Sequence, residues 1–260
     1  MDEYGLLVAG IEDRIRQCEE RYMITNTAFL DLKQRSEAER YIKKSKISAG
    51  IFWGGYPEAE RCMLIFVPDY VQLKPGAGDI FEDYGEDNPL AVIRAEYSGK
   101  GRELSHRDFL GSLMALGIKR ECIGDIIVNR TGADIIVMKE MCDFLVYNYG
   151  KAGSTYLNIE KIDFSQLSTP EIRLREKSDT VASLRLDNVI SSAFGVSRGT
   201  AAESIKTGLV FVNSIQTEKT DFQVKCGDVL VLRGKGKAVL SEVGGKSRKD
   251  RIYIKTGIYE

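Results

Sequence analysis

The sequence has little of what metal binding and acid–base catalysis require. Its 260 residues contain one histidine, His106, and five scattered cysteines that form no Cys-x-x-Cys pair. Zinc sites combine closely spaced cysteines and histidines, so this pattern disfavours a metal centre, and we expect no cofactor. No paired catalytic carboxylates or Ser/His/Asp set can be recognised either, which predicts a protein without catalytic residues. An odd, scattered set of cysteines is typical of a reducing compartment, where they pack as small hydrophobes.

Long apolar runs are also missing. The first ten residues, MDEYGLLVAG, carry acidic groups where a secretory signal needs positive charge. No apolar stretch reaches the length of a membrane span. We therefore expect a cytoplasmic protein, monomeric and without a membrane partner. Hydrophobic residues make up 43% and charged residues 29%, as in an ordinary globular protein with room for two or three domains.

An overall excess of positive charge is absent, because the formal net charge is −1. The distribution is uneven, however. From Val181 onward the chain carries 13 Lys and Arg against 8 Asp and Glu, a net charge of +5, whereas the remainder carries a net charge of −6. A basic end on an acidic body is expected where one domain meets phosphate groups.

The first 80 residues predict an N-terminal module of mixed α and β structure. Residues 2–22 have the apolar spacing of an amphipathic helix. The letters S-E-A-E from Ser36 predict a capping box at the start of a second helix. Residues 47–55 and 61–68 read as two paired strands, and the glycine-rich stretch Lys74–Asn88 predicts a loop or linker.

Residues 81–165 predict a middle domain with alternating strands and helices in the order βαββαβ, which is the ferredoxin-like arrangement used by RNA-recognition domains among others. The predicted elements are Leu90–Tyr97, Arg107–Leu116, Asp125–Asn129, Ala133–Met138, Lys139–Tyr149 and Thr155–Ile162. RNA-recognition domains stack bases on aromatic residues of the third strand, but ADIIVM offers none. We therefore expect no conventional base stacking on this sheet.

The polar stretch Ser165–Thr180 predicts a linker to a third domain, residues 181–260. Within it, Arg185–Asn213 reads as two short helices and a strand. Apolar residues follow helical spacing in the first helix, Gly195 ends it, and Ser197 is placed to cap the second. Asn213-Ser214 predicts a turn.

Three separated motifs of this region, RLD, SRGTAAESIKTGLVFVN and GDVLVLRGKGK, closely resemble the S-four RNA-binding domain. The resemblance covers about the last third of the chain. It implies an α+β domain whose two helices form an L and present basic residues to structured RNA. The RNA-facing positions that it implies are Arg185, Ser197, Arg198, Lys206, Arg233, Lys235 and Lys237.

Several of these residues also have structural interpretations. Asp187 can pair with Arg185 and orient it, and Lys206 can be only a partner of the helix dipole. Arg198 lies at a helix start, where the dipole disfavours a cation, so we interpret it as a binding residue. The Arg233–Lys237 segment lacks the spacing of a phosphate-binding P-loop and predicts a hairpin. A basic loop that precedes the last strand supplies a further candidate RNA surface: Lys246, Arg248, Lys249 and Arg251.

The segment SHRDFLGSLMALGIKRECIGDI, together with the C-terminal motifs, resembles the YlmH family of bacterial RNA-binding proteins over essentially the whole chain. The resemblance implies an N-terminal helical module, a ferredoxin-like middle domain and an S-four domain. It also implies association with the large ribosomal subunit during rescue of stalled nascent chains, with ribosomal RNA and tRNA or peptidyl-tRNA as partners and no bond chemistry.

His106-Arg107-Asp108 has the letters of a kinase catalytic loop, but no glycine-rich loop or metal motif accompanies it. Ser105 and Asp108 instead predict a capped helix start. Arg107, Lys119 and Arg120 either form a secondary RNA surface or are plain solvated charge. Two other functions remain open: an RNA-modifying enzyme of the pseudouridine synthase or methyltransferase kind, and a cell-division scaffold.

Overall fold

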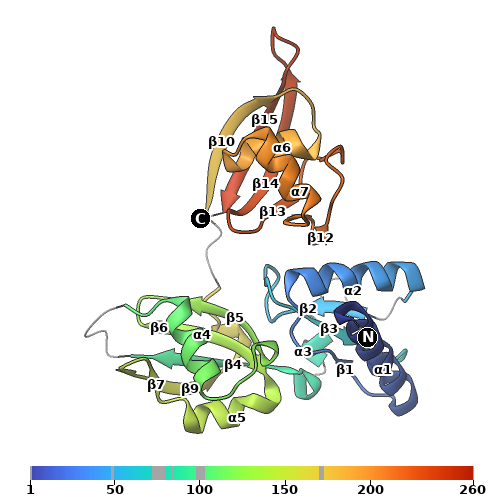
Figure 1. The fold of residues 1–260 in the computed structure, drawn as a ribbon. Helices are drawn as coiled ribbons and strands as arrows, with labels where there is room; N and C mark the ends of the chain where they lie inside the picture. The colour runs from blue at the N-terminus through green and yellow to red at the C-terminus, as the bar shows by residue number, and fades with distance from the viewer. Residues whose placement is uncertain are drawn as a thin grey trace. The chain divides into compact units, whose positions relative to one another are not determined.

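The computed structural model describes a chain of two compact units, residues 1–170 and 171–260 (Figure 1). The described residues are 2–47, 50–71, 80–83, 85–97, 103–169 and 173–259. Helices and antiparallel strands occur in both units, which confirms the predicted α+β class. Within the described residues, no helix has the length and apolar character needed to cross a membrane.

The first unit opens with a small module of two helices and a three-stranded sheet. Its elements are α1 (Glu3–Arg21), β1 (Thr25–Asn26), α2 (Leu32–Ser45), β2 (Gly50–Trp53) and β3 (Met63–Phe66). The predicted first helix is confirmed, and the Asp2 carboxylate caps it by accepting a hydrogen bond from the Gly5 N–H at 2.8 Å. The predicted pairing of the two strands is also confirmed, with β3 between β1 and β2.

The predicted start of the second helix at Ser36 is wrong. α2 begins at Leu32, because Asp31 and Gln34 form the capping box instead. The Asp31 carboxylate accepts from the Gln34 N–H at 2.8 Å, and the Gln34 side chain accepts from the Asp31 N–H at 2.9 Å. Two orphan backbone donors are thereby satisfied one turn upstream of Ser36, which lies buried inside the helix.

The predicted linker Lys74–Asn88 lies partly outside the described residues. Its described part is not a plain loop, because it contains α3 (Ile80–Asp83) and a 3-10 turn, η1 (Gly85–Asp87). Ile80 is buried in a core that also holds Met63 from β3 and Val92 from the following strand. The N-terminal module and the segment after it therefore share one core.

The second half of the first unit has the predicted βαββαβ order. Its main elements are β4 (Leu90–Glu96), α4 (His106–Ala115), β5 (Ile123–Val128), β6 (Gly132–Met138), α5 (Lys139–Asn148) and β9 (Asn158–Ile162). Shorter elements complete it: η2 (Arg120–Cys122), β7 (Lys151–Ala152), β8 (Thr155–Tyr156) and η3 (Phe164–Gln166). The sheet order β5-β6-β4-β9, antiparallel throughout, is that of a split-βαβ arrangement. The single strand predicted at Thr155–Ile162 is divided, because β8 pairs with β7 as a separate hairpin.

Both faces of this sheet are covered. On one face, Ile93 and Ile135 pack with residues of α4 and α5 such as Phe109 and Leu145. On the other face, Val92 and Ile136 pack with residues of the N-terminal module that include Phe29 and Met63. Strand β6 has no aromatic residue and is almost entirely buried. The sheet therefore offers no open face for bases to stack on.

An ion pair joins the two central strands on the module-facing side. The Arg94 guanidinium donates to both carboxylate oxygens of Asp134, at 2.7 and 2.8 Å, and to the Gln166 carbonyl at 2.8 Å. The Ser168 N–H donates to the same carboxylate at 2.8 Å. Burial alone would raise the pKa of Asp134, but the hydrogen bonds from Arg94 and Ser168 outweigh it and lower the pKa overall. The carboxylate thus fastens residues 166–168 to the sheet.

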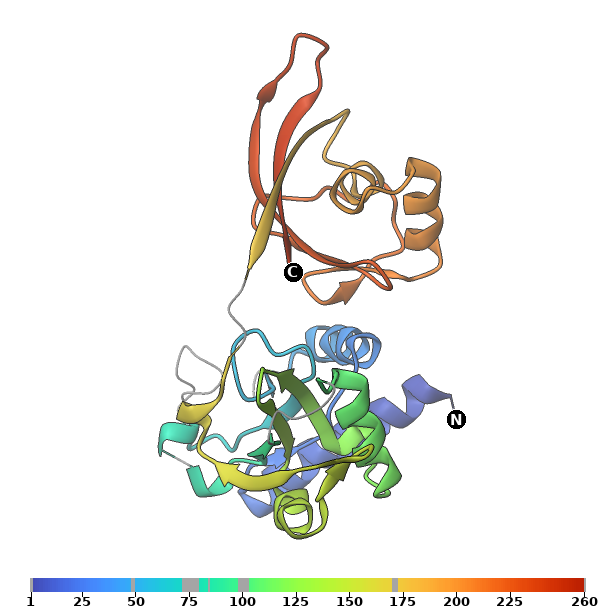
Figure 2. The same cartoon turned by 90° about the vertical axis from the view of Figure 1, so that its left-hand side faces the viewer.

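The second unit is a six-stranded antiparallel sheet with two helices. Its elements are β10 (Leu174–Val181), α6 (Leu186–Phe194), α7 (Arg198–Lys206), β11 (Val210–Val212), β12 (Ile215–Gln216), β13 (Val229–Leu232), β14 (Gly236–Lys246) and β15 (Ile252–Tyr259). The strands lie in the order β10-β15-β14-β13-β11-β12. Figure 2 shows α6 nearly end-on beside an upright α7, so the two helices cross at a large angle.

The sequence predicts that residues 174–180 are part of a linker, and this prediction is wrong. They belong to β10, which pairs with β15 from Leu174↔Tyr259 to Val181↔Ile252. Most of the β10 side chains are exposed, so the strand lacks the alternation of apolar and polar residues by which half-buried strands are recognised. The predicted linker residues 170–172 lie outside the described residues.

Candidate nucleic-acid interface

Helix α6 is set by its apolar stripe, as predicted. Val189, Ile190 and Ala193 are buried against the sheet of the second unit. Gly195 ends the helix in the left-handed region, with φ of +64°, which a residue with a Cβ adopts reluctantly. The chain therefore turns sharply into α7, and the start of α7 is placed beside the start of α6.

Ser197 caps α7, as the sequence predicts. Its hydroxyl accepts a hydrogen bond from the Thr200 N–H at 3.0 Å and contacts the Thr200 hydroxyl at 2.8 Å. Ala201 and Ile205 bury the inner face of the helix. This cap leaves the first turn of α7, including Arg198, facing solvent.

Asp187 joins the starts of the two helices. Its side chain is only 5% exposed and accepts from Arg185 Nε at 3.3 Å and from Arg198 Nε at 2.9 Å. Burial raises the pKa of Asp187, but the hydrogen bonds from the two arginines outweigh this and lower the pKa. The carboxylate is therefore ionised at neutral pH and holds two guanidinium groups side by side.

This ion pair corrects one sequence-based argument. The helix dipole predicts that Arg198 has no electrostatic reason to stand at a helix start. It has one, because Asp187 neutralises it there. The Arg198 side chain is nevertheless 58% exposed. Arg198 can thus stabilise the helix corner and present its outer edge to a ligand.

The predicted hairpin between β13 and β14 is confirmed. It turns through Gly234 and Gly236, whose φ values of +80° and +121° require glycine. Lys235 is exposed at its tip. Arg233 lies 5.5 Å from the Phe211 ring centre, and Lys237 lies 4.6 Å from that of Tyr259, so both cations rest on aromatic rings.

Lys206 stands in the last turn of α7, where the helix dipole favours a cation. It is exposed and at the opposite end of that helix from Arg198. Its position therefore fits both a partner of the helix dipole and a contact to RNA.

The segment predicted as a basic loop is the tip of the long β14–β15 hairpin (Figure 2). Lys246 pairs with Asp250 at 2.8 Å, and Arg251 donates to the Thr180 hydroxyl at 3.0 Å. Arg248 and Lys249 are exposed at the tip itself. Two of the four cations therefore also fasten the hairpin and the neighbouring strand β10.

Lys177 was not among the predicted site residues, because the polar sequence of its strand β10 reads as a linker. Lys177 lines a cleft of about 390 Å³ between β10 and α6, together with Arg198 and Arg251. Its ammonium group donates to the Ser192 carbonyl at the end of α6. A third cation therefore joins two of the predicted ones in one polar cleft of the second unit.

The secondary candidates lie in the first unit and differ from one another. Arg107 is exposed in the first turn of α4, and Lys119 pairs with Glu121 at 3.7 Å. Arg120 donates to the carbonyls of Ile123 and Gly124, at 2.6 and 3.2 Å, and burial lowers its pKa to about 10. Arg120 therefore stabilises its own chain segment.

The start of α4 is built as predicted. The Asp108 carboxylate accepts from the Ser105 N–H at 2.8 Å and from its hydroxyl at 2.7 Å, a reciprocal cap beside His106. Among the residues that the structure describes, no group of three or more His, Cys, Asp or Glu side chains could hold a metal ion.

Two family models match the chain. One, described as "YlmH, N-terminal", matches residues 7–71, and the other, "Putative RNA-binding domain in YlmH", matches residues 84–166. The "Ribosome-associated protein quality control protein P2" of Bacillus subtilis is 34% identical over 250 residues, which cover 96% of this chain and 93% of that protein. The chain belongs to the YlmH family. This confirms the predicted resemblance to the YlmH family.

A solved structure titled "Cell division protein ylmH from Streptococcus pneumoniae" is 18% identical, with a TM-score of 0.49. The similarity covers 65% of this chain and 96% of that one. The YlmH model for residues 84–166 coincides with the split-βαβ segment, whose sheet is closed on both faces in this structure.

Proposed function

We propose that this YlmH-family chain is a non-catalytic RNA-binding protein of the large ribosomal subunit that takes part in quality control of stalled nascent chains. The observation that carries the proposal is the helix corner, where buried Asp187 holds Arg185 and half-exposed Arg198 at the start of α6 and α7. Such a fixed pair of guanidinium groups suits phosphate oxygens of folded RNA.

Charge and resemblance support the same site. The second unit carries the positive end of the chain, and Lys206, Arg233, Lys235 and Lys237 stand on its helices and hairpin. The sequence of residues 181–260 resembles an S-four domain, whose helical L meets structured RNA. We assign this domain to the second unit, with β10 as an additional strand.

The proposed association with the ribosome is based on similarity to the Bacillus subtilis protein. The Bacillus subtilis protein is named for ribosome-associated quality control, and it is similar along nearly the whole chain. We infer that this chain meets ribosomal RNA and tRNA or peptidyl-tRNA, acts as a monomer in the cytoplasm and performs no bond chemistry. Phosphate neutralisation makes its binding fall steeply with salt.

The test is co-sedimentation of purified chain with large ribosomal subunits. Arg198→Ala combined with Lys235→Ala removes two exposed cations, and we expect roughly tenfold weaker binding with an unchanged circular-dichroism spectrum. The matched control is Lys43→Ala with Lys44→Ala on α2, which removes the same charge from the first unit. Equal binding of both double variants would contradict the proposed interface.

The competing functions are separated by activity and by partner capture. Methyl transfer to ribosomal RNA, or isotope release from labelled uridine, would make the chain an RNA-modifying enzyme and overturn the proposal. A cell-division scaffold would retain its protein partners after nuclease treatment, whereas we expect ribosomal proteins to be lost from the pull-down once RNA is digested.

A further inference from the structure

The closed sheet raises the question of where the first unit could contact RNA. Strand β6, which would carry stacking residues in an RNA-recognition domain, is buried between the helices and the N-terminal module. Any RNA contact of this unit must therefore use another surface. Among the described residues, a large cleft lies beside α4.

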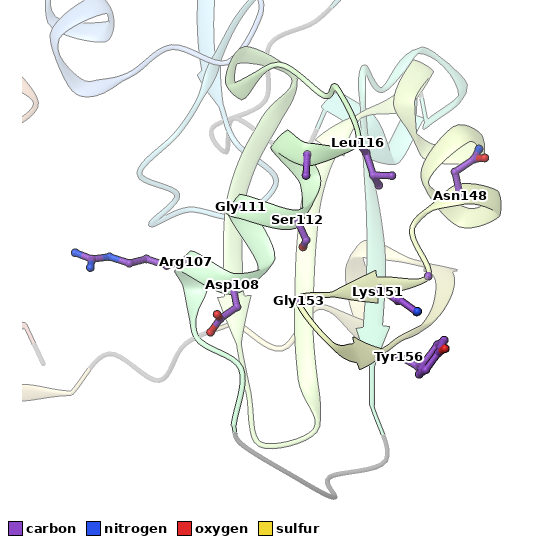
Figure 3. Close-up of a pocket in the computed structure, with 11 residues that line it drawn as sticks. Arg107, Asp108, Gly111, Ser112, Leu116, Asn148, Lys151, Gly153 and Tyr156 are labelled. Atoms are coloured by element: carbon purple, nitrogen blue, oxygen red, sulfur yellow. The ribbon is translucent and has the colours of Figure 1, made fainter.

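The cleft has a volume of about 800 Å³ and lies between α4 and the β7–β8 hairpin (Figure 3). Ligand sites of small molecules and single nucleotides fall in the range of about 300–1,000 Å³. In Figure 3, Ser112 and Leu116 stand on the α4 side, while Lys151 and Tyr156 lie on the hairpin side. Arg107 extends away from the hairpin, so it does not carry the argument.

The hairpin wall has the chemistry of a stacking site. Tyr156 is 73% exposed, so its ring is accessible to a ligand at the edge of the cleft. The Lys151 ammonium group lies 4.1 Å from the Tyr156 ring centre. An exposed ring next to a cation can stack a base while the cation contacts the phosphate attached to that base.

The helix wall is open and firmly supported. An added Cβ at Gly111 of α4 would meet no atom within 4 Å, and the same holds for Gly150 and Gly153 on the hairpin side, so these glycines leave the backbone accessible from the cleft. Beneath them, the Ser112 hydroxyl is bonded to the buried Tyr149 hydroxyl at 2.8 Å, which ties α4 to the end of α5. The cleft is therefore a fixed hollow rather than a loose gap between loops.

We propose that this cleft binds an unpaired nucleotide of RNA, with its base on Tyr156 and its phosphate at Lys151. The assignment rests on the proposed RNA-binding function and adds a second contact, in the first unit. The acidic neighbour Asp108 lies on the α4 side of the cleft, away from Lys151 and Tyr156 (Figure 3), and its carboxylate accepts two hydrogen bonds from Ser105 at the helix cap.

The test uses photo-crosslinking of the full-length chain to an eight-nucleotide RNA that contains 4-thiouridine. Crosslinked peptides are located by mass spectrometry. We expect crosslinks at the Tyr156 peptide as well as in the second unit. Gly111→Trp fills the cleft without removing any charge, and it should reduce the Tyr156 crosslink roughly tenfold while the crosslinks of the second unit persist.

Gly10→Trp is the matched control, because Gly10 is also an exposed helical glycine with no atom within 4 Å of an added Cβ. It should leave every crosslink unchanged. A second pair of variants separates the ring from its hydroxyl: Tyr156→Phe should retain the crosslink at its peptide, and Tyr156→Ala should lose it roughly tenfold.

The outcomes distinguish this inference from the proposed function. Crosslinks confined to the second unit would overturn the cleft assignment and leave the helix corner standing. Crosslinks in neither unit would remove both. Crosslinking at Tyr156 that equimolar uridine monophosphate abolishes would identify a site for a free nucleotide, and it would likewise overturn the assignment to RNA.

Discussion

Two buried carboxylates, one in each unit, hold arginines in opposite ways. Asp134 is completely buried, and its partner Arg94 is 20% exposed. Arg94 makes two hydrogen bonds to the carboxylate and another to the Gln166 carbonyl, all within the first unit. Asp187 is nearly as buried, but its partners Arg185 and Arg198 are 38% and 58% exposed.

The difference shows what each pair does. The Arg94 guanidinium donates hydrogen bonds to Asp134 and Gln166 of its own unit, and those of Arg61 and Arg120 donate to backbone carbonyls. These arginines stabilise the first unit and have little to offer a ligand. The second unit instead anchors its two arginines at one end and leaves the other end in water, which is the arrangement expected for binding.

The largest expected effect is on stability. Asp134→Ala leaves Arg94 without its partner beneath the N-terminal module, and we expect a loss of about 3 kcal/mol in the free energy of unfolding. Trp53 is the single tryptophan of the chain and lies in β2, so its fluorescence during urea unfolding reports the first unit.

The comparison variant is Asp187→Ala. Its arginines can turn into water, so we expect a loss of about 1 kcal/mol in the second unit, measured by amide hydrogen exchange of α6 and α7. Equal losses of stability in the two variants would contradict the distinction between the buried Arg94–Asp134 pair and the partly exposed pairs of Asp187.

Acid provides the next test. The pKa values of Asp134 and Asp187 are both below the ordinary value of about 3.9 for aspartate, because hydrogen bonds from arginine outweigh burial. Each carboxylate therefore contributes stability that is fully present above about pH 5 and is lost as the pH falls through its folded pKa. With Asp134→Asn, the free energy of unfolding of the first unit should fall less between about pH 5 and pH 3 than it does in the parent chain. Trp53 fluorescence during urea unfolding at each pH measures this. Identical acid profiles of the variant and the parent chain would contradict it.

The direction of the change in RNA affinity in Asp187→Ala is a third test, because two physical effects predict opposite changes. Asp187→Ala removes a negative charge from the proposed interface, so simple Coulomb attraction predicts tighter binding. We expect weaker binding, by roughly threefold to tenfold, because Arg185 and Arg198 lose the carboxylate that fixes them before RNA arrives. Co-sedimentation with large ribosomal subunits measures the effect, and tighter binding would show that the anchoring does not matter.

Local signals in the sequence were sufficient for much of the fold. Residues close together in the sequence determine the cap at Ser197, the turn at Gly195 and the split-βαβ order. The structure confirms all three. The capping box of α2 was misplaced because Asp31 and Gln34 compete with Ser36 for the same role, and pattern alone does not rank them.

The remainder depends on contacts between distant residues. Strand β10 exists because β15 pairs with it, although its own side chains lack strand periodicity. The anchoring of Arg198 depends on Asp187, eleven residues earlier, and on the turn that brings the two helix starts together. The cover over the sheet depends on Phe29, which approaches so closely that a Cβ at Gly124 would lie 2.7 Å from its ring.

The smallest effect separates charge from geometry. Arg94→Lys retains the charge but cannot reproduce two parallel hydrogen bonds to Asp134, so we expect a loss of about 1–2 kcal/mol in the first unit. Arg198→Lys should change the stability of the second unit by less than about 0.5 kcal/mol, because that pair is half in water. Its RNA affinity should fall by roughly threefold, since a lysine ammonium contacts phosphate as a point charge. Urea unfolding and subunit co-sedimentation measure the two quantities. A larger stability loss in Arg198→Lys than in Arg94→Lys would reverse the comparison.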